Sequence, residues 1–457
     1  MTRPAWLASR GPRPARPRPR AAPIGLRAPL LPLALTLGIG GCGRGAAGDD
    51  PVQLRFWAMG REGEVVQELV REFERENPDI RVRVQQIPWT AAHEKLLTAF
   101  VGDATPDISQ LGNTWIPEFV ALGALQPLDP LLERPGGLAG EHFFPGIWAT
   151  NVVDSVAYGV PWYVDTRVMF YRTDLLAQVG YEDPPDSWER WRDAMVRLRD
   201  RMGPEEYPIL LPINEWAQPV ILGMQAGAPL LRDDGGRGAF RDPRFRRAFD
   251  FYIGLFRDDL APALSNTEIA NLYQEFARGT IAMYISGPWN IGEFSRRLPE
   301  ELQDDWSTAP LPGPGGPGVS MAGGSSLVMF RDSDHPDAAW RLIEFLSAER
   351  QQLRFYELTG NLPAVRSAWD APELAENRYA AAFRDQLERV EPLPKVPEWE
   401  NIATKVLEYA EAAARGRTGI DETLAALDRD VDRILEKRRW MMERERERER
   451  VSRGGSR

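Results

Sequence analysis

The chain has 457 residues, enough for two or three domains, and 43% of them are hydrophobic, as in a folded globular protein. Its net charge of -11 disfavours a nucleic-acid binder, and without a run of about 18 apolar residues it cannot be a polytopic membrane protein. With three histidines and one cysteine, the chain has too few of these residues for a typical His/Cys metal site or a disulfide framework. We therefore expect no metal and no cofactor.

The amino terminus has the order of an export signal. Seven arginines and no acidic residue occur before or at the start of the apolar run APLLPLALTLGIGG at residues 28–41, which is too short to span a membrane in the mature protein. The run ends at Cys42, and the sequence IGGC resembles a bacterial lipobox, in which the signal is removed and the cysteine receives lipid. We therefore expect a lipoprotein signal peptide over residues 1–41 and a flexible tether over residues 42–51. The protein would be exported to the cell envelope, in the periplasm or at the cell surface, and anchored to the membrane through Cys42.

Strand and helix patterns alternate after the tether. Residues 52–58 alternate as a strand does, whereas the apolar residues between 65 and 73 form the stripe of an amphipathic helix. The predicted strands are 52–58, 80–87 and 107–111, and the predicted helices are 64–77 and 92–101. This order indicates βαβ units and a mostly parallel sheet.

The pattern is less regular beyond residue 150. Strands are predicted at 158–160 and 167–171, on either side of Pro161-Trp162-Tyr163, and at 280–285 and 325–330; helices are predicted at 187–202, 243–258, 269–278, 335–358, 398–415 and 420–439. Residues 307–318 are rich in Pro and Gly and are predicted to be a loop. The charged tail, residues 441–457, contains ERERERER, for which we expect a solvated surface and no specific function.

Catalytic motifs are scarce in the sequence. It contains no nucleophile elbow, phosphate-binding loop, zinc-protease helix or dinucleotide fingerprint. Its 67 acidic residues leave open a pair of carboxylates like that of a glycosidase, because spacing in the sequence does not show which two face each other.

Tryptophans follow many of the predicted strands. Ligands of open α/β sheets bind beyond the carboxyl ends of the strands, and flat indoles pack well against the C–H faces of sugar rings. A single tryptophan at such a position is more often part of the core, but a series of them favours a ligand site. The tryptophans of this series are Trp57, Trp89, Trp115, Trp162, Trp216 and Trp289, and Trp399 begins a late helix.

Several segments together resemble a known family. These segments are FWAMGREGEVVQELVREFERENP at 56–78, TPDISQLGNTWIPEFVALGALQPLD at 105–129, YGVPWYVDTRVMFYRTDLL at 158–176, RGTIAMYISGPWNI at 278–291, MAGGSSLVMF at 321–330 and TGNLPAVRSAW at 359–369. In this order they resemble the extracellular sugar-binding lipoproteins of bacterial ABC importers, of the maltose-binding-protein type (solute-binding protein family 1).

The resemblance implies an α/β, periplasmic-binding-protein-like fold with two discontinuous lobes, a hinge and a ligand cleft between the lobes. Lobe 1 would comprise residues 52–164 and 327–364, and lobe 2 residues 165–326 and 365–440. The chain would cross between the lobes near Asp165, near Ser325–Phe330 and near Pro363–Arg366.

The resemblance also implies a set of ligand contacts. Trp289 in GPWNI matches the stacking tryptophan of the family, and Asp165 matches an acid at the first crossing. Arg61-Glu62 reverses the acid-then-base order of the maltose-binding type, which leaves the identity of the ligand open. Gly323-Gly324 could form a tight turn or also contact ligand, and Asn361 could bind ligand or cap a turn. The expected ligand-binding residues are Trp57, Arg61, Glu62, Trp89, Asn113, Thr114, Trp115, Trp162, Tyr163, Asp165, Trp216, Trp289, Asn290, Gly324, Ser325, Asn361 and Trp399.

We therefore expect a monomeric, non-catalytic binding protein that delivers a sugar or oligosaccharide to the transmembrane subunits of an ABC permease. One alternative is an exported carbohydrate-active enzyme in which Asp165 or Glu62 is a general acid or nucleophile. Another is the same fold with a polyamine, a metal chelate or a phosphate ester as its ligand; a phosphate ester would require a cluster of arginines.

Overall fold

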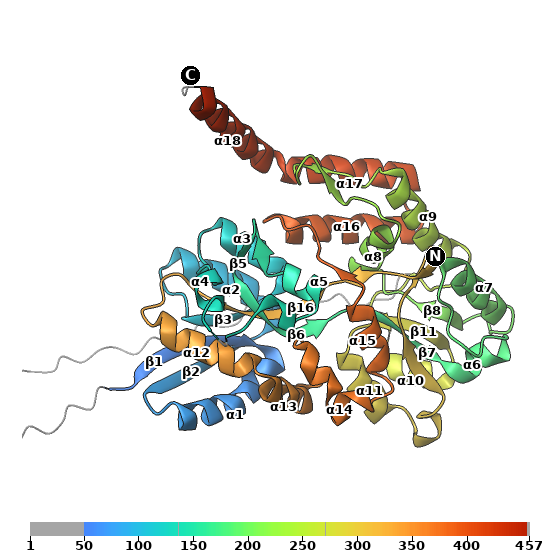
Figure 1. The fold of residues 1–457 in the computed structure, drawn as a ribbon. Helices are drawn as coiled ribbons and strands as arrows, with labels where there is room; N and C mark the ends of the chain where they lie inside the picture. The colour runs from blue at the N-terminus through green and yellow to red at the C-terminus, as the bar shows by residue number, and fades with distance from the viewer. Residues whose placement is uncertain (1–49, 136, 270, 455–457) are drawn as a thin grey trace, which may run out of the picture. The chain divides into compact units, whose positions relative to one another are not determined.

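The computed structural model describes residues 50–135, 137–269 and 271–454. The expected signal peptide and Cys42 lie outside these residues, as does most of the expected tether. The described residues form a six-stranded sheet and a four-stranded sheet, each with helices packed against it (Figure 1). None of the helices in this part of the chain combines the length and the apolar character needed to span a bilayer.

The six-stranded sheet contains the predicted βαβ units. Its strand order is β17-β6-β16-β3-β1-β2. The strands are β1 (Val52–Met59), β2 (Ile80–Ile87), β3 (Ile108–Gly112), β6 (Gly159–Asp165), β16 (Gly323–Met329) and β17 (Leu362–Pro363). β1 pairs in parallel with β2 and β3, whereas β16 pairs antiparallel with β3 and β6. The parallel part confirms the βαβ units predicted over residues 52–111.

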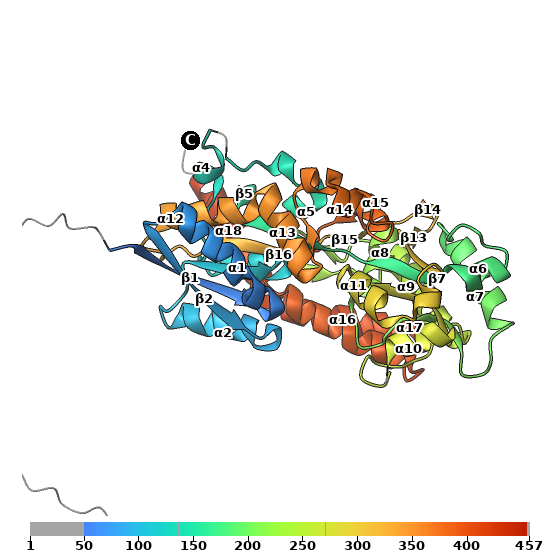
Figure 2. The same cartoon turned by 90° about the horizontal axis from the view of Figure 1, so that it is seen from below.

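Helices cover both faces of this sheet. Successive side chains of β1 point to opposite faces, and apolar side chains on each face are buried against helices. Leu54 and Phe56 face a core shared with α1 (Gly60–Glu76) and α12 (Pro336–Ser347). Met59 faces the other side, where α2 (Trp89–Val101) packs. Figure 2 shows α1 and α12 on one side of β1 and β2 and α2 on the other. α1 begins four residues earlier than predicted, directly after β1, because Gly60 turns the chain with a positive φ of 50°.

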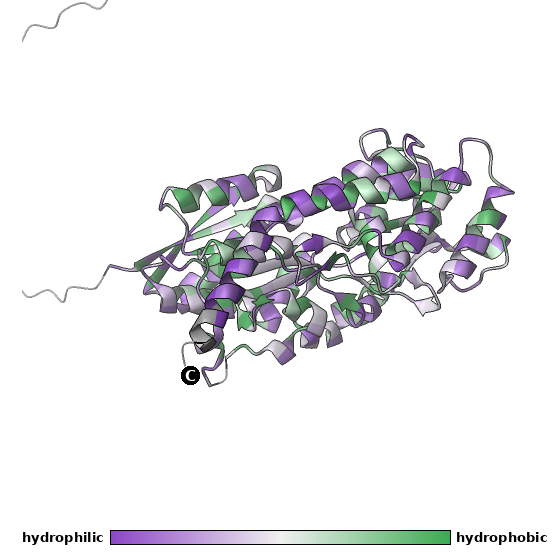
Figure 3. Ribbon diagram, turned by 90° about the horizontal axis from the view of Figure 1, so that it is seen from above, coloured by the Kyte–Doolittle hydropathy of each residue, from purple (hydrophilic) through white to green (hydrophobic). Residues whose placement is uncertain are grey.

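The four-stranded sheet has the order β12-β7-β11-β8. Its strands are β7 (Val168–Arg172), β8 (Tyr207–Leu210), β11 (Ile281–Ser286) and β12 (Trp306–Ala309). The helices of this half include α6 (Thr173–Gln178), α7 (Trp188–Arg199), α8 (Ala217–Gln225), α9 (Pro243–Arg257), α10 (Leu272–Arg278), α11 (Trp289–Arg297), α15 (Ala381–Leu387), α16 (Trp399–Ala414) and α17 (Ile420–Ile434). The charged tail continues as α18 (Glu436–Gly454), which Figure 3 shows as mostly hydrophilic.

Three predicted elements differ from the structure. β6 runs through Pro161 without a break, because the proline lies where its pairing with β16 shifts register between Ser325 and Ser326. The predicted loop 307–318 contains most of β12, paired with β7, and the short hairpin of β13 (Pro312–Gly313) and β14 (Gly316–Pro317). The predicted helix 335–358 is two helices, α12 and α13 (Glu349–Thr359), separated at Ala348, whose ψ of 143° is extended.

The chain passes between the two sheets three times. The first passage joins β6 to β7 after Asp165, as expected. The second comes earlier than expected, because all of β16 from Gly323 onward lies in the six-stranded sheet. The third comes later than Pro363–Arg366, because Val365 still bridges to Phe143 of the first half and α15 is the next helix to pack on β12 and β7.

Candidate functional site

A cavity of about 400 Å³ lies where elements of both sheets meet. The first half lines the cavity with residues at the end of β3, at the end of β6, at the start of β16 and in the first turns of α1 and α2. The second half lines it with the turn between β11 and α11. The lining residues are Glu62, Trp89, Gly112, Thr114, Trp115, Tyr163, Val164, Asp165, Pro288, Trp289, Gly324, Ser325 and Asn361. The sequence did not point to Gly112, Val164 or Pro288, which contribute backbone and apolar surface.

Three indoles contribute to the wall of the cavity. Trp89 and Trp115 contact each other edge to face, with ring centroids 5.8 Å apart. A Cβ on Gly60 would lie 2.9 Å from the Trp89 ring, so glycine is needed at this turn. Trp289 belongs to the other half and is 42% exposed, which is unusual for so large a side chain. It rests against Gly287, where any side chain would clash with the indole.

Two carboxylates face the same cavity. Glu62 Oε1 accepts a hydrogen bond of 3.0 Å from Asn361 Nδ2. Asp165 forms an ion pair with Arg167, whose guanidinium lies 4.8 Å from the centroid of the Trp289 ring. Burial raises the pKa of the Asp165 carboxyl, and the Arg167 charge opposes that rise. In the described part of the chain, no group of three or more His, Cys, Asp or Glu side chains is placed to hold a metal ion.

The floor of the cavity is a buried hydrogen-bond network around Gln110. Gln110 Oε1 accepts from the Met59 backbone N–H at 2.8 Å, and Nε2 donates to the Tyr163 hydroxyl at 3.2 Å and to Ser325 Oγ at 3.1 Å. Ser325 Oγ in turn donates to the Tyr163 hydroxyl at 3.1 Å. Burial, followed by the charge of Glu62, raises the pKa of Tyr163 well above its usual range, so the phenol stays protonated. The network ties β1, β3, β6 and β16 together directly beneath the site.

Two of the expected indoles belong to the core, which corrects their assignment from the sequence. Trp162 is fully buried and stacks on Phe355 of α13 with ring centroids 4.4 Å apart. It points away from the cavity because neighbouring side chains of a strand face opposite sides, and its neighbour Tyr163 faces the site. Trp399 is 1% exposed and packs within the core of the second half.

The other expected residues are not among those that line the cavity. Trp57 lies under the Lys95 ammonium, which is 4.9 Å from its ring centroid, and Trp216 packs on the edge of Trp399 at 5.9 Å. The exposed Arg61 donates to the Leu358 carbonyl.

Two expected amides are buried in hydrogen bonds of their own. Asn113 Oδ1 accepts from Ser326 Oγ at 3.1 Å. Asn290 Oδ1 accepts from the Tyr273 hydroxyl at 2.9 Å, and its Nδ2 donates to Ser286. Asn290 therefore positions the start of α11, next to Trp289.

Comparison with known proteins gives consistent matches. The family model of bacterial extracellular solute-binding proteins matches residues 58–353. The structure of the sugar-binding protein MalE from Xanthomonas citri is 49% identical, covers 86% of this chain and 99% of its own, and superposes with a TM-score of 0.84.

Two curated relatives are similar over most of their length. A galactooligosaccharide-binding protein of Bacillus subtilis is 24% identical over 422 residues, covering 86% of this chain and 93% of its own. An uncharacterized lipoprotein of Streptomyces antibioticus is 28% identical over 399 residues, covering 83% of this chain and 86% of its own. Together with the structural match, these similarities confirm the two-lobe α/β fold expected from the sequence. The first lobe is the half with the six-stranded sheet, and the second lobe is the half with the four-stranded sheet.

Proposed function

Because the chain belongs to the bacterial extracellular solute-binding protein family, we propose that it binds a sugar or oligosaccharide between its lobes and delivers it to the membrane subunits of an ABC importer. The observation that carries this proposal is the cavity, which brings Trp89 and Trp115 of one lobe together with Trp289 of the other. Indoles on opposite walls can pack against the apolar faces of sugar rings. A cavity of about 400 Å³ falls within the usual size range of small-molecule sites.

The polar lining of the cavity suits neutral sugars. Glu62 and Asp165 accept hydrogen bonds from hydroxyl groups, and Tyr163 and Ser325 can exchange bonds with them. No arginine or lysine is among the residues that line this cavity, and the nearby Arg167 is paired with Asp165. A phosphate ester or an acidic sugar would therefore meet two carboxylates without an opposing cation, which disfavours both ligands.

We propose that the protein returns its ligand unchanged. The enzyme alternative relied on Glu62 or Asp165 as a general acid or nucleophile, and both carboxyls are on the cavity wall. Each of them is held by a neighbour, Glu62 by Asn361 and Asp165 by Arg167, which suits the binding of hydroxyl groups. Family membership also favours binding over catalysis.

We further propose that the mature protein is exported and anchored through a lipid on Cys42. This proposal rests on the amino-terminal sequence and on similarity to a lipoprotein. Replacing Cys42 with Ser is expected to release into the soluble fraction a protein that still binds sugar. A wild-type protein that retains residues 1–41, or that partitions into water without lipid, would contradict the anchor.

A titration panel tests the central proposal. Isothermal titration with maltose, maltotetraose and galactooligosaccharides should give saturable binding to at least one of them, and glucuronic acid and glucose 6-phosphate should give none. The bound sugar, recovered by chromatography, should be chemically intact. Turnover that is abolished by Asp165→Asn would establish the enzyme alternative, and saturable binding of the phosphate ester would overturn the sugar assignment.

A further inference from the structure

The first two segments that join the lobes meet at one buried residue. Ser320 in β15 (Ser320–Met321) has a relative exposure of 0%. Its Oγ donates to the Arg167 carbonyl at 3.0 Å and accepts from the Arg167 N–H at 3.2 Å, which ties the second passage to the first. Ser320 also pairs in parallel with Val390 of β18 (Val390–Glu391), which follows α15 and the third passage along the chain. Two of the three passages and β18 therefore meet at one compact hinge.

The segment after β18 belongs to the second lobe. Leu393 and Val396 are buried in the core of that lobe, with 6% and 4% of their surface exposed. Pro392 and Pro394 each fix one backbone dihedral angle, so the segment is stiff. The backbone of Lys395, between Pro394 and Val396, therefore moves with the second lobe.

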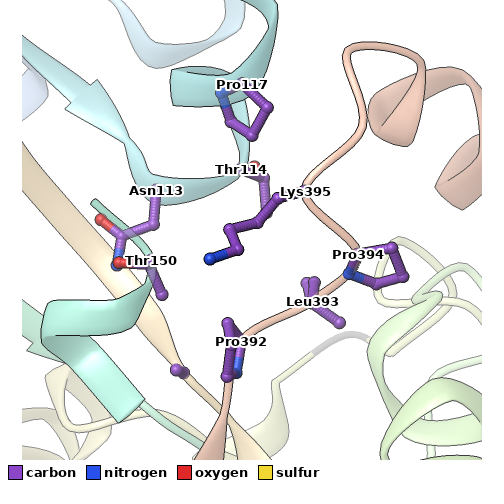
Figure 4. Close-up of a pocket in the computed structure, with 9 residues that line it drawn as sticks. Asn113, Thr114, Pro117, Thr150, Pro392, Leu393, Pro394 and Lys395 are labelled. Atoms are coloured by element: carbon purple, nitrogen blue, oxygen red, sulfur yellow. The ribbon is translucent and has the colours of Figure 1, made fainter. Parts of the chain in front are cut away.

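The side chain of Lys395 reaches the first lobe. Its Nζ donates to the carbonyl of Val152 at 2.7 Å and to the carbonyl of Ala149 at 3.3 Å. Ala149 is the last residue of α5 (Pro145–Ala149), where helix carbonyls lack intrahelical partners and attract a cation. Val152 packs against the hydrophobic cluster that contains Leu54 and Phe56 of the first lobe. Figure 4 shows the side chain extending from the proline segment toward Asn113 and Thr150.

This contact adjoins the ligand cavity. Lys395 lines a small hollow of about 20 Å³ together with Asn113 and Thr114, and Thr114 also lines the ligand cavity. We propose that Lys395 is a positioning residue that latches the lobes in the arrangement in which the ligand cavity is complete, and that it thereby sets sugar affinity without contacting sugar. The part of this inference that concerns affinity rests on the proposed function, whereas the latch itself is a property of the empty protein.

The latch has a direct physical basis. An ammonium that donates to two carbonyls makes charge-assisted hydrogen bonds, which are stronger than neutral ones. Burial lowers the pKa of Lys395 and the charge of Asp154 opposes that fall. When the binding-competent arrangement is already populated, less of the ligand's binding free energy is consumed in bringing the lobes together.

The first measurement is the distance between the lobes without any sugar. Spin labels at Val101→Cys on the first lobe and Arg201→Cys on the second, in the full chain with Cys42→Ser, report that distance by pulsed electron resonance; both labelled positions are exposed. Lys395→Met keeps the aliphatic stem and removes the donors, so its distance distribution should broaden and shift. Lys405→Met is the matched control and should behave as the wild type, because the Lys405 ammonium pairs with Glu408 of its own helix, α16. Lys395→Arg, which retains donors, should restore the narrow distribution.

The second measurement is the affinity for maltotetraose by titration calorimetry. Lys395→Met should weaken binding by about three- to tenfold through the lost pre-organisation. Lys395→Arg should recover most of that loss, and Lys405→Met should match the wild type. An unchanged distance distribution in Lys395→Met overturns the latch, whatever the affinity does. A wild type that binds no sugar in the panel overturns the proposed function, while the distances still decide for or against the latch.

Discussion

The two walls of the ligand cavity are built differently. On the first lobe, Trp89 and Trp115 support each other, and Gln110 ties the neighbouring strands together through buried hydrogen bonds. On the second lobe, Trp289 is the indole of the wall, is 42% exposed, and has the Arg167 guanidinium over its ring.

This difference assigns a separate task to each wall. A braced wall loses little conformational freedom when a ligand arrives, so its hydroxyl acceptors and donors can fix the orientation of the sugar. An exposed indole on the other lobe can settle on the free face of the sugar when the lobes close. Substitutions that break the buried network of the first wall should therefore affect both folding and binding, whereas substitutions in the second wall should affect binding alone.

Among substitutions at the two walls, the largest effect is expected from Gln110→Leu. Leucine has a similar volume but cannot bond, so the Met59 N–H loses its buried acceptor, whereas the hydroxyls of Tyr163 and Ser325 keep each other. A buried group left unpaired costs about 1–3 kcal/mol, and the two weakened hydroxyls add to that cost, so the free energy of unfolding should fall by roughly 2–5 kcal/mol. Urea unfolding measures that loss, and sugar titration should show weaker binding as well. The control is Gln53→Leu, at an exposed position of β1, which should unfold like the wild type. Wild-type stability in Gln110→Leu would show that the first wall is not braced by this network.

Trp289→Ala should separate binding from folding. An indole stacked on a sugar ring buries some tens of Å², which at about 25 cal/mol per Å² is on the order of 1–3 kcal/mol. Binding should therefore weaken by roughly ten- to a hundredfold. Stability should change little, because 42% of this residue is already exposed in the empty protein. Sugar should also change the tryptophan emission of the wild type more than that of the variant.

Trp340→Ala is the matched control for the second wall. Trp340 is 1% exposed in α12 and is not among the residues that line the ligand cavity. Its truncation leaves a cavity in the core and should destabilise the protein by about 3–5 kcal/mol while leaving the affinity of the folded fraction unchanged. If Trp289→Ala behaves in this way instead, Trp289 is a structural residue.

Sequence patterns pointed to those residues of the candidate site that lie at or just after the ends of strands. Glu62, Tyr163, Asp165 and Trp289 follow strands or lie at strand ends, and the family resemblance pointed to three of these positions. The position of Trp162 near a strand end also pointed to a ligand contact. That assignment is wrong, because Trp162 and its neighbour Tyr163 on β6 face opposite sides of the sheet, and Tyr163 faces the cavity. The ends of strands show where a site lies, but they do not show which side chains face it.

The remaining parts of the site depend on contacts between distant residues. Gln110 acts through Met59, 51 residues away, and through Ser325, 215 residues away. Lys395 acts through Ala149, 246 residues away. Nothing in the immediate sequence around Gln110 or Lys395 marks either residue. For the same reason, β12 was predicted as a loop, since its Pro- and Gly-rich surroundings conceal a strand that forms by pairing with β7.

A smaller effect is expected from Glu62→Gln in the first wall. The amide oxygen can still accept a hydrogen bond from Asn361, so the fold should be unaffected, but hydrogen bonds from sugar hydroxyls to a neutral acceptor are weaker. We expect binding to weaken by about three- to tenfold, or about 1 kcal/mol. Titration calorimetry at pH 7 measures the change. An effect as large as that of Trp289→Ala would mean that the first wall supplies most of the affinity.

The smallest effect concerns His93, which supports the first wall from behind. Its ring lies 5.0 Å from the centroid of Trp115, and Nε2 bonds Glu118 at 2.6 Å. The hydrogen bond to Glu118 raises the pKa of His93 above 6.5, and burial opposes that rise. A raised pKa means that the folded state holds the proton more tightly than the unfolded state. The resulting stabilisation is therefore fully present below pH 6.5 and is lost as the pH rises through the pKa of the folded state.

Both His93 and Glu118 are partly exposed, so the pH-dependent difference in stability should stay below about 1 kcal/mol. Urea unfolding from pH 5 to pH 8 should show that the free energy of unfolding of the wild type falls relative to that of His93→Gln. The contributions of the other titrating groups cancel in this difference, because both proteins contain them. Parallel curves for the two proteins would show that the pair contributes no pH-dependent support to Trp115.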